Sequence, residues 1–456
     1  MTVDRFVNKD NMSLLTDLYE LTMTQVYFNR GMNGTAVFNF FIRPTNKRNY
    51  FLNAGLELLI DYLLNSKFTE EDVDFLRQTG RFSEDFLEYL RNFKFTGNLY
   101  AIDEGEIVFA NEPIVQVEAP LIEAQIIETF LINTLQISIL VATKALRCYS
   151  VAEKAVLVDF GLRRAHGTDA GMIASRSSYI GGFVGTSNVL AGKAFGIPIY
   201  GTMAHSFIMA HDTEEKAFED FASVYPENTI FLVDTYDSLE GVKNAIKVAK
   251  KLGIRIKGIR LDSGDVAILS KEARKLLDAN GFRDAIIFVS GGINEYKIKE
   301  LIQDKKAPIN GFGVGTELVT SADLPYLDCA YKLVEYERKP KIKLSRKKMT
   351  LPFKKQLFRI YKNGTIFKDI VGHFDEHFDD SVKMLKLYIE NGELARSLPS
   401  LKEIREKALI NFKTVPNTFK SLNQYMTLTP EISHRLLKSA EELKEKLRLK
   451  YWKIYF

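Results

Sequence analysis

Residues 256–265 read Ile-Lys-Gly-Ile-Arg-Leu-Asp-Ser-Gly-Asp, an apolar run that ends abruptly in a polar turn containing a glycine. The isoleucines and the leucine are typical of a buried strand. Residues 266–280 follow with a helical pattern, and Gly281 is a typical helix stop. In α/β barrels the chemistry lies at the carboxyl ends of the strands, so this turn is a candidate part of an active site.

A simpler interpretation of the same turn is that its Asp and Ser side chains only cap the following helix. Taken alone, the turn fits both interpretations, and the neighbouring segments have to decide between them.

The same rhythm recurs along the middle of the chain. Short apolar runs end in polar residues at positions 234, 262, 290 and about 315, a spacing typical of one βα unit. Repeated units without hairpin signals predict a parallel sheet. Seven such strands favour closure into a barrel; they lie at 156–159, 183–187, 197–205, 230–234, 256–262, 286–290 and 312–316.

The regions on either side have a different character. Residues 1–135 predict an α+β domain, in which 11–30 form an amphipathic helix with Leu15, Leu18, Tyr19, Thr22 and Val26 near one face. The barrel is expected at 136–325. Residues 326–456 predict an extension of short strands and charged helices, and the Lys- and Arg-rich stretch 332–355 is expected to be a solvated face.

Composition narrows the classes of function. The chain has 456 residues, a net charge of +4 and two cysteines, so nothing favours a nucleic-acid partner, a disulfide framework or a cysteine-based zinc site. The beginning of the sequence carries no signal-peptide pattern. The apolar stretch 122–141 is interrupted by polar residues and predicts a buried helix rather than a membrane span. A cytoplasmic protein is expected.

Two late glycine turns indicate phosphate binding. Gly291 and Gly292 follow one predicted strand, and Gly313-Val-Gly-Thr316 follows the next. Such turns present backbone N–H groups to anions, and barrels commonly bind phosphate after their last strands. Each turn alone is also compatible with an ordinary loop. Together with the carboxylates they predict a phosphorylated sugar with Mg²⁺, for which no direct protein ligands are predicted.

Three further side chains at strand ends suggest the second substrate. Arg163 and Arg260 provide positive charge for an anionic group, and Phe160 offers a flat face for a planar ring.

His205 is expected to end a strand. A lone histidine is often a satisfied core side chain, but its polar neighbourhood favours a catalytic role, and without a second His or Cys at ligand spacing zinc is not expected.

Six motifs in order resemble those of the nicotinate phosphoribosyltransferase family. They are Thr-Asp-Leu-Tyr-Glu-Leu-Thr-Met (16–23), Phe-Gly-Leu-Arg-Arg-Ala (160–165), Gly-Thr-Ser-Asn (185–188), Gly-Thr-Met-Ala-His-Ser (201–206), Arg-Leu-Asp-Ser-Gly-Asp (260–265) and Gly-Val-Gly-Thr (313–316). The resemblance implies a type II phosphoribosyltransferase fold, an irregular, TIM-like α/β barrel with an N-terminal domain and a C-terminal extension.

The resemblance also implies the reaction. Nicotinate and 5-phosphoribosyl 1-diphosphate would give nicotinate mononucleotide and diphosphate in NAD biosynthesis, coupled to ATP hydrolysis through a phosphohistidine at His205. Members of the family are homodimers with shared active sites. The resemblance therefore implies that Tyr19 and Arg43 reach the neighbouring subunit's site.

Residues and resemblance together predict the site. His205 and Asp262 are the predicted catalytic residues. The predicted nicotinate subsite comprises Tyr19, Phe160, Arg163, Ser187 and Arg260. The predicted phosphoribosyl diphosphate subsite comprises Arg43, Asp262, Ser263, Gly264, Gly291, Gly292, Gly313, Gly315 and Thr316.

Ser187 bears on the choice of base. The related nicotinamide enzymes place an aspartate at this position, where a carboxylate would repel a carboxylate substrate. The neutral serine favours nicotinate, and nicotinamide is the alternative. A barrel that binds ligands without catalysis is the alternative from a different class.

Overall fold

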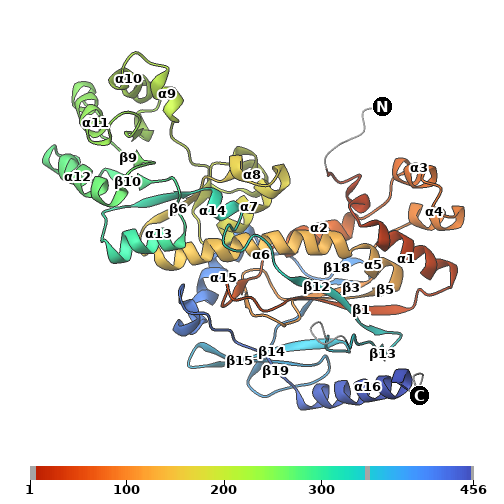
Figure 1. Cartoon of the computed structure of the whole chain (residues 1–456). Coiled ribbons are helices and arrows are strands. Elements are labelled where there is room, and N and C mark those ends of the chain that lie inside the picture. The colour runs from red at the N-terminus through yellow and green to blue at the C-terminus, as the bar shows by residue number, and fades with distance from the viewer. Residues whose placement is uncertain (1–6, 345–349, 453–456) are drawn as a thin grey trace. The chain divides into compact units, whose positions relative to one another are not determined.

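The computed structural model describes residues 7–344 and 350–452, and the chain divides into two compact units. Leu140–Pro325 form the first, which we call the parallel unit. The chain up to Ile139 and from Tyr326 onward forms the second, the antiparallel unit. Figure 1 shows the elements of each unit.

The parallel unit is built on a six-stranded, entirely parallel sheet in the order β7-β6-β11-β10-β9-β8. The first strand of the unit, β6, pairs with the last, β11, so the strands follow a cyclic order. Beyond β7, a single bridge joins Thr186 to Ile199. Among the described residues no strand pairing joins Ile199 to β8, so the ring of strands is not closed there. The predicted irregular α/β barrel is confirmed; the strands are β6 (Val156–Asp159), β7 (Gly185–Thr186), β8 (Ile230–Leu232), β9 (Gly258–Leu261), β10 (Ile286–Val289) and β11 (Gly311–Val314).

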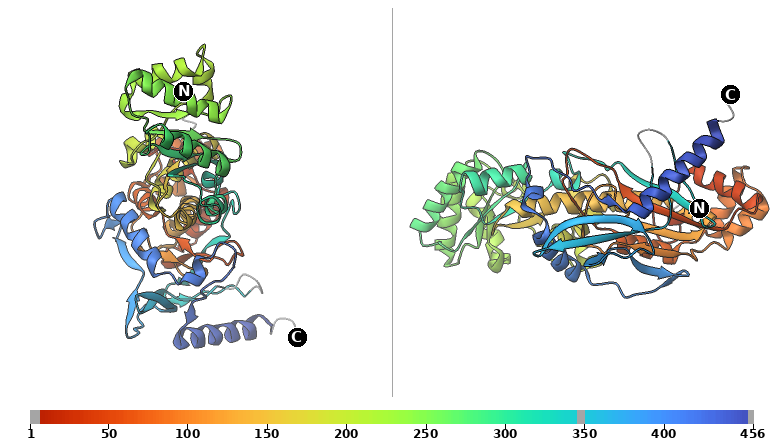
Figure 2. Two further views of the ribbon diagram at one scale, coloured as in Figure 1. Left: turned by 90° about the vertical axis from the view of Figure 1, so that its left-hand side faces the viewer. Right: turned by 90° about the horizontal axis from the view of Figure 1, so that it is seen from below.

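Helices follow the strands, as expected of βα units. After β9, Asp265 caps α12 (Val266–Ala279) by accepting the N–H groups of Ala267 and Ile268, and Gly281 leaves the helix with φ +88°. Helices α10 (Glu214–Val224), α11 (Ser238–Leu252) and α12 pack side by side, as Figure 2 shows in green. The other helices after these strands are α7 (Thr168–Ile180), α8 (Val189–Phe195), α9 (His205–Met209), α13 (Glu295–Lys299) and α14 (Thr316–Val319).

One predicted strand of the parallel unit is wrong. Residues 197–205 contribute only the isolated bridge at Ile199, and His205 begins α9 instead of ending a strand. Gly201 and the residues beside it form an irregular connection here. The apolar run that suggested a strand is only four residues long, too short to predict a ladder without knowledge of its partner.

The antiparallel unit contains a seven-stranded sheet in the order β13-β12-β1-β5-β3-β17-β18 and a four-stranded sheet in the order β16-β14-β15-β19. In the larger sheet, C-terminal strands pair with N-terminal ones: β12 with β1, and β17 with β3. The strands of the larger sheet are β1 (Thr35–Ile42), β3 (Asn98–Ala101), β5 (Val115–Pro120), β12 (Cys329–Tyr336), β13 (Lys339–Pro340), β17 (Lys386–Glu390) and β18 (Glu393–Leu394). Residues from both ends of the chain therefore complete one sheet.

The smaller sheet is formed by β14 (Lys355–Lys362), β15 (Thr365–His373), β16 (Ser381–Lys383) and β19 (Glu431–Ile432), and α16 (His434–Trp452) packs against β15. A two-stranded pair joins β2 (Phe51–Leu52) to β4 (Ile107–Val108). The helices of this unit include α1 (Leu18–Asn29), α2 (Leu56–Asn65), α3 (Glu70–Gln78), α4 (Glu84–Arg91), α5 (Leu121–Ile126) and α15 (Leu401–Thr414).

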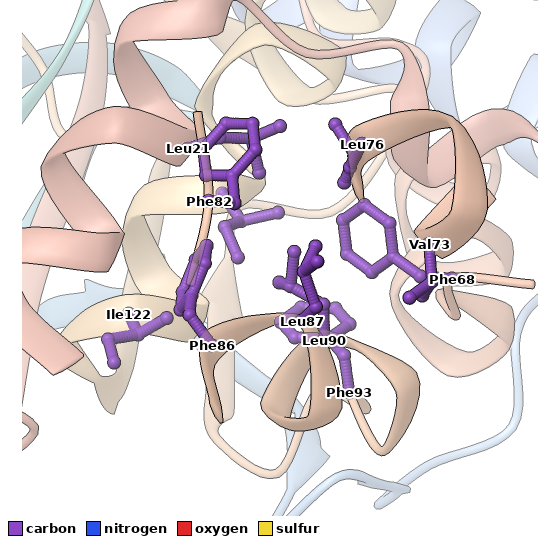
Figure 3. Close-up of a cluster of buried hydrophobic side chains, with 11 residues drawn as sticks. Leu21, Phe68, Val73, Leu76, Phe82, Phe86, Leu87, Leu90, Phe93 and Ile122 are labelled. Atoms are coloured by element: carbon purple, nitrogen blue, oxygen red, sulfur yellow. The ribbon is translucent and has the colours of Figure 1, made fainter. Parts of the chain in front are cut away.

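Helix α1 buries a different face from the predicted one. Leu21 joins a cluster of buried side chains from α3, α4 and α5, shown in Figure 3. Leu15, Leu18, Tyr19 and Val26 are instead exposed. Of the helix predicted over 11–30, only Leu18–Asn29 is α-helical, and the apolar pattern alone does not indicate which face of that helix is buried.

Lys355 corrects another prediction. It belongs to the Lys- and Arg-rich stretch expected to be a solvated face, but its side chain is buried at the start of β14. Residues 345–349 of the same stretch lie outside the described residues.

Helix α6 (Glu128–Val151) is, among the described residues, the one helix long and apolar enough to cross a membrane by length and composition. Of its most apolar window, 67% is buried inside the protein, which is typical of a core helix.

Candidate active site

Arg260, near the end of β9, is the centre of a polar network at the carboxyl ends of the strands. Its Nε donates to Ser290 Oγ (2.8 Å), Nη1 donates to Thr202 Oγ1 (3.1 Å) and to the Met203 carbonyl (3.2 Å), and Nη2 donates to Asp262 Oδ1 (2.9 Å). An arginine has five N–H groups, so one on Nη2 has no partner among the described residues. The guanidinium is thus held rigidly, with one donor left for a ligand.

Asp262 shares this network. Its Oδ1 accepts hydrogen bonds from Ser290 and Arg260. Burial by itself would raise the pKa of Asp262, but these two partners hold the pKa of this carboxyl below its ordinary value. Asp262 is therefore a carboxylate at neutral pH.

Asp234, which follows β8, supports the turn from the neighbouring strand. Its Oδ2 accepts the Asp262 N–H (2.8 Å) and the Ser263 hydroxyl (2.7 Å). Its Oδ1 is buried and has no partner among the described residues. The two acids of the turn therefore have different roles. Asp265 caps α12, whereas Asp262, together with Ser263, belongs to the polar network.

Gly291 and Gly292 follow β10 as predicted, whereas Gly313 lies within β11 and only Gly315 and Thr316 follow that strand. Gly291 has φ +84°, and a Cβ there would lie 2.1 Å from the Asp262 carbonyl oxygen. A Cβ on Gly313 would lie 2.3 Å from the Phe160 ring. Each glycine permits a close approach that a side chain would prevent. The turn after β10 is thereby packed directly against the Asp262 turn.

Two cavities meet at these residues. One, of about 250 Å³, is lined by Asp262, by the glycines 291, 292, 313 and 315, and by Thr316. The other, of about 260 Å³, is lined by Ser187, Gly201 and Thr202. Phe160, Arg163 and Arg260 line both cavities. The arrangement provides two adjoining subsites with a shared wall of two cations and one aromatic ring.

Buried hydrogen bonds fix the backbone around Phe160 and Ser187. Asp159 accepts the Gly161 N–H (2.8 Å) and the hydroxyls of Ser175 (2.9 Å) and Thr186 (2.8 Å). Burial raises the pKa of Asp159 despite these donors. The Ser187 N–H donates to the Asp159 carbonyl (2.8 Å). Asp159 therefore holds the backbone beside both Phe160 and Ser187, which line the second cavity.

His205 lies close enough to Asp262 for its charge to lower the pKa of that carboxyl. Its Nδ1 is 3.1 Å from the Thr235 hydroxyl. Its Nε2 has no partner among the described residues. The histidine is therefore oriented by one ring nitrogen and available at the other.

A buried ion cluster joins the two loops that carry the glycine turns. Lys144 Nζ lies 2.6 Å from Glu295 Oε2 and 2.8 Å from Asp323 Oδ1, and Arg147 Nε donates to Glu295 Oε1 (2.9 Å). Glu295 follows the turn after β10, and Asp323 follows the turn after β11. The side chains of Lys144 and Glu295 are fully buried. The cluster thus connects the loops that line the first cavity.

The structure brings together the predicted site residues of the parallel unit. Those lining the two cavities are Phe160, Arg163, Ser187, Arg260, Asp262, Gly291, Gly292, Gly313, Gly315 and Thr316. Ser263 and Gly264 belong to the adjoining turn, in which Gly264 has φ +80°. Tyr19 and Arg43 lie in the antiparallel unit, where Arg43 pairs with Asp328.

Sequence reasoning assigned no role to several residues of this site. Asp234, Ser290 and Thr202 stood at the ends of predicted segments, so their positions were a usable signal. Lys144 and Arg147 had a weaker sequence signal. They are two cations at i, i+3 spacing within an apolar helical stretch.

Known proteins resemble this chain along most of its length. The model of the nicotinate phosphoribosyltransferase N-terminal domain matches residues 14–136, and that of the nicotinate phosphoribosyltransferase family matches residues 155–365. The chain is 43% identical to nicotinate phosphoribosyltransferase pncB2 of Mycobacterium tuberculosis, with 90% of this chain and 89% of the relative covered. It is 46% identical to the nicotinate phosphoribosyltransferase of Bacillus subtilis, covering 83% and 79%.

A solved structure agrees. Human nicotinic acid phosphoribosyltransferase superposes with a TM-score of 0.84 at 28% identity, over 94% of this chain and 99% of that one. Family models, curated relatives and a solved structure thus converge on one assignment. The chain belongs to the nicotinate phosphoribosyltransferase family.

Proposed function

We propose that this protein transfers the phosphoribosyl group of 5-phosphoribosyl 1-diphosphate to nicotinate, giving nicotinate mononucleotide and diphosphate in NAD biosynthesis. The pair of adjoining cavities that share Phe160, Arg163 and Arg260 carries the proposal. The glycine-lined cavity suits a sugar phosphate, and the cavity beside Ser187 suits a small planar acid.

The residues of the site suit this chemistry. The bond from the anomeric carbon to diphosphate breaks as the pyridine nitrogen forms the new bond, and the protein supplies orientation and charge rather than a nucleophile. The remaining N–H of Arg260 and the side chain of Arg163 would hold the nicotinate carboxylate. Phe160 would support the pyridine ring, and Asp262 would hold the ribose hydroxyls.

Mg²⁺ would enter with the diphosphate. Among the described residues there is no group of three or more His, Cys, Asp or Glu side chains that could hold a metal. Mg²⁺ usually keeps several of its waters and binds substrate phosphates, so we propose that the diphosphate brings the metal into the site without a direct protein ligand. The metal would neutralise charge on the departing diphosphate.

The first test is an activity assay of the purified protein with phosphoribosyl diphosphate, Mg²⁺ and either nicotinate or nicotinamide, each with and without ATP. Nicotinate mononucleotide is the expected product. Product from nicotinamide alone would instead favour the nicotinamide enzyme, and no product from either base would favour a non-catalytic barrel.

We extend the proposal to ATP coupling through His205. In the tautomer that carries its proton on Nδ1 and donates it to Thr235, the Nε2 lone pair can take the γ-phosphoryl group of ATP, releasing ADP, and water later returns the histidine and phosphate. His205→Ala is expected to abolish nicotinate-dependent ADP formation while basal, ATP-independent transfer remains. Phosphohistidine analysis of wild type and variant checks this. ADP formation that persisted in the variant would contradict the assignment.

Ser187→Asp tests the choice of base. The new carboxylate would share a cavity with the substrate carboxylate, and the repulsion is expected to lower kcat/KM for nicotinate by roughly tenfold or more. Ser187→Asn, which adds similar volume without charge, is the control. Equal losses in both variants would show that volume rather than charge matters here.

We also propose a cytoplasmic homodimer with shared sites. The exposed apolar side chains of α1, which include Leu18, Tyr19 and Val26, give a second copy a surface to cover. If Tyr19 serves the partner's site, mixing inactive Tyr19→Ala and Arg260→Ala variants by denaturation and refolding should restore about a quarter of the activity, because mixed dimers regain one intact site. No recovery in dimers of confirmed mixed composition would argue against shared sites.

A further inference from the structure

The antiparallel unit contains a cavity of about 300 Å³ that the proposed reaction does not use. Its walls are largely apolar and include Phe41, Pro113, Val334, Val371, Ile432 and Ala440. None of the predicted active-site residues lines it. Its volume lies at the lower end of the range for small-molecule sites.

Lys355 lines this cavity and is unusual for a buried cation. Its side-chain Nζ donates to the carbonyls of Leu351 (2.8 Å) and Phe353 (2.7 Å), and the Pro352 carbonyl is 3.4 Å away, at the limit of a hydrogen bond. Among the described residues, no carboxylate lies within ion-pair distance of it. A protonated Lys355 therefore has one weakly bonded N–H and no counter-ion, a costly state for a buried charge.

Two further polar groups line the cavity. Asn39 is 2% exposed, and its Nδ2 donates to Gln116 (3.0 Å), but its Oδ1 has no partner among the described residues. Lys444 adds a second cation from α16. Among the described residues, no aspartate or glutamate lines the cavity. The walls thus combine two lysine side chains, one unpaired acceptor and an apolar surface.

We propose that this cavity binds a small aromatic monocarboxylate that carries a hydrogen-bond donor beside its carboxylate. The apolar walls hold the ring, Lys355 pairs with the carboxylate, and Asn39 Oδ1 accepts the donor. A water molecule could satisfy Asn39 but would leave Lys355 without a counter-ion. The inference is independent of the proposed function, because it concerns residues of the antiparallel unit alone.

The probe is 2-aminobenzoate, which has a ring, a carboxylate and an adjacent amino donor and is fluorescent. It is titrated into the full-length protein. Ile432→Trp fills the cavity from a residue that is 38% exposed, so the core is spared. Val382→Trp is the matched control, since Val382 is 48% exposed in the same sheet and does not line the cavity.

The expected result is binding to wild type and to Val382→Trp, and binding roughly tenfold or more weaker to Ile432→Trp. Arg260→Ala separates this site from the active site, where an aromatic acid could also bind, and should leave the measured affinity unchanged. No binding to wild type, or binding lost in Arg260→Ala but kept in Ile432→Trp, overturns the proposal.

Proton uptake provides a second readout. Burial lowers the pKa of Lys355 to about 7, so at pH 8 the free protein carries mostly the neutral amine. A bound carboxylate favours the ammonium, so calorimetry in buffers of different ionisation enthalpy should show uptake approaching one proton at pH 8 and little at pH 6.

The neighbouring charges do not confuse this readout. Glu335 acts on Lys355 through space and favours its charged form. Burial and Arg435 lower the pKa of His373, which is therefore neutral at pH 8 and takes no part. Lys355→Met should abolish the uptake. Binding to wild type at pH 8 without proton uptake would overturn the role of Lys355.

Discussion

Asp262→Ala is expected to lower kcat/KM for phosphoribosyl diphosphate by roughly a hundredfold or more. The substitution removes the carboxylate that orients Arg260 and Ser290 and would hold the ribose. Losing one preorganised polar contact of an active site commonly costs ~10²–10³ in rate. Steady-state kinetics with each substrate varied in turn measures the effect.

Asp265→Ala is the matched control within the same turn. Asp265 only caps α12, so this variant should lose about 1 kcal/mol of stability and keep its kinetic constants. The pair separates the two interpretations of the turn. Equal losses of activity in both variants would show that the conformation of the turn matters rather than the Asp262 carboxylate. That result would contradict the role assigned to Asp262.

Glu295→Ala is expected to destabilise the parallel unit by about 3–5 kcal/mol, since it removes the buried carboxylate that pairs with both Lys144 and Arg147 and leaves Asp323 as the nearest carboxylate to Lys144. Lys144 and Arg147 hold the pKa of Glu295 below its ordinary value against the effect of burial. Because Glu295 follows the Gly291–Gly292 turn, the KM for phosphoribosyl diphosphate should rise more than kcat falls.

Chemical denaturation followed by circular dichroism measures the stability, and hydrogen exchange of residues 286–304 localises it. The double variant Lys144→Met/Glu295→Leu should lose less than the sum of the single changes, because it removes charge of both signs together. Glu240→Ala, which breaks an exposed pair with Lys243, should leave stability unchanged. Additive losses in the double variant would exclude a coupled cluster.

Much of the barrel could be predicted from local pattern. Each βα unit carries its own signals, as in 256–281, where the apolar run, the polar turn, the capping acid and the stop glycine are contiguous. The carboxyl ends of parallel strands lie at the same edge, so the convergence of Arg260, Asp262 and the glycine turns followed from the order of the elements.

The tertiary structure decided what depends on distant partners. Lys355 lies in a stretch that is basic in composition, yet three nearby carbonyls and the apolar walls of a cavity surround it. The exposed stripe of α1 and the absence of a strand at 197–205 likewise depend on neighbours that local periodicity does not encode. Pairing between β1 and β12 joins residues about 300 positions apart, and no local signal specifies such a contact. Sequence alone therefore determined which side chains stand at the ends of most strands, His205 excepted, and only tertiary packing decided which of them touch and which charges are buried.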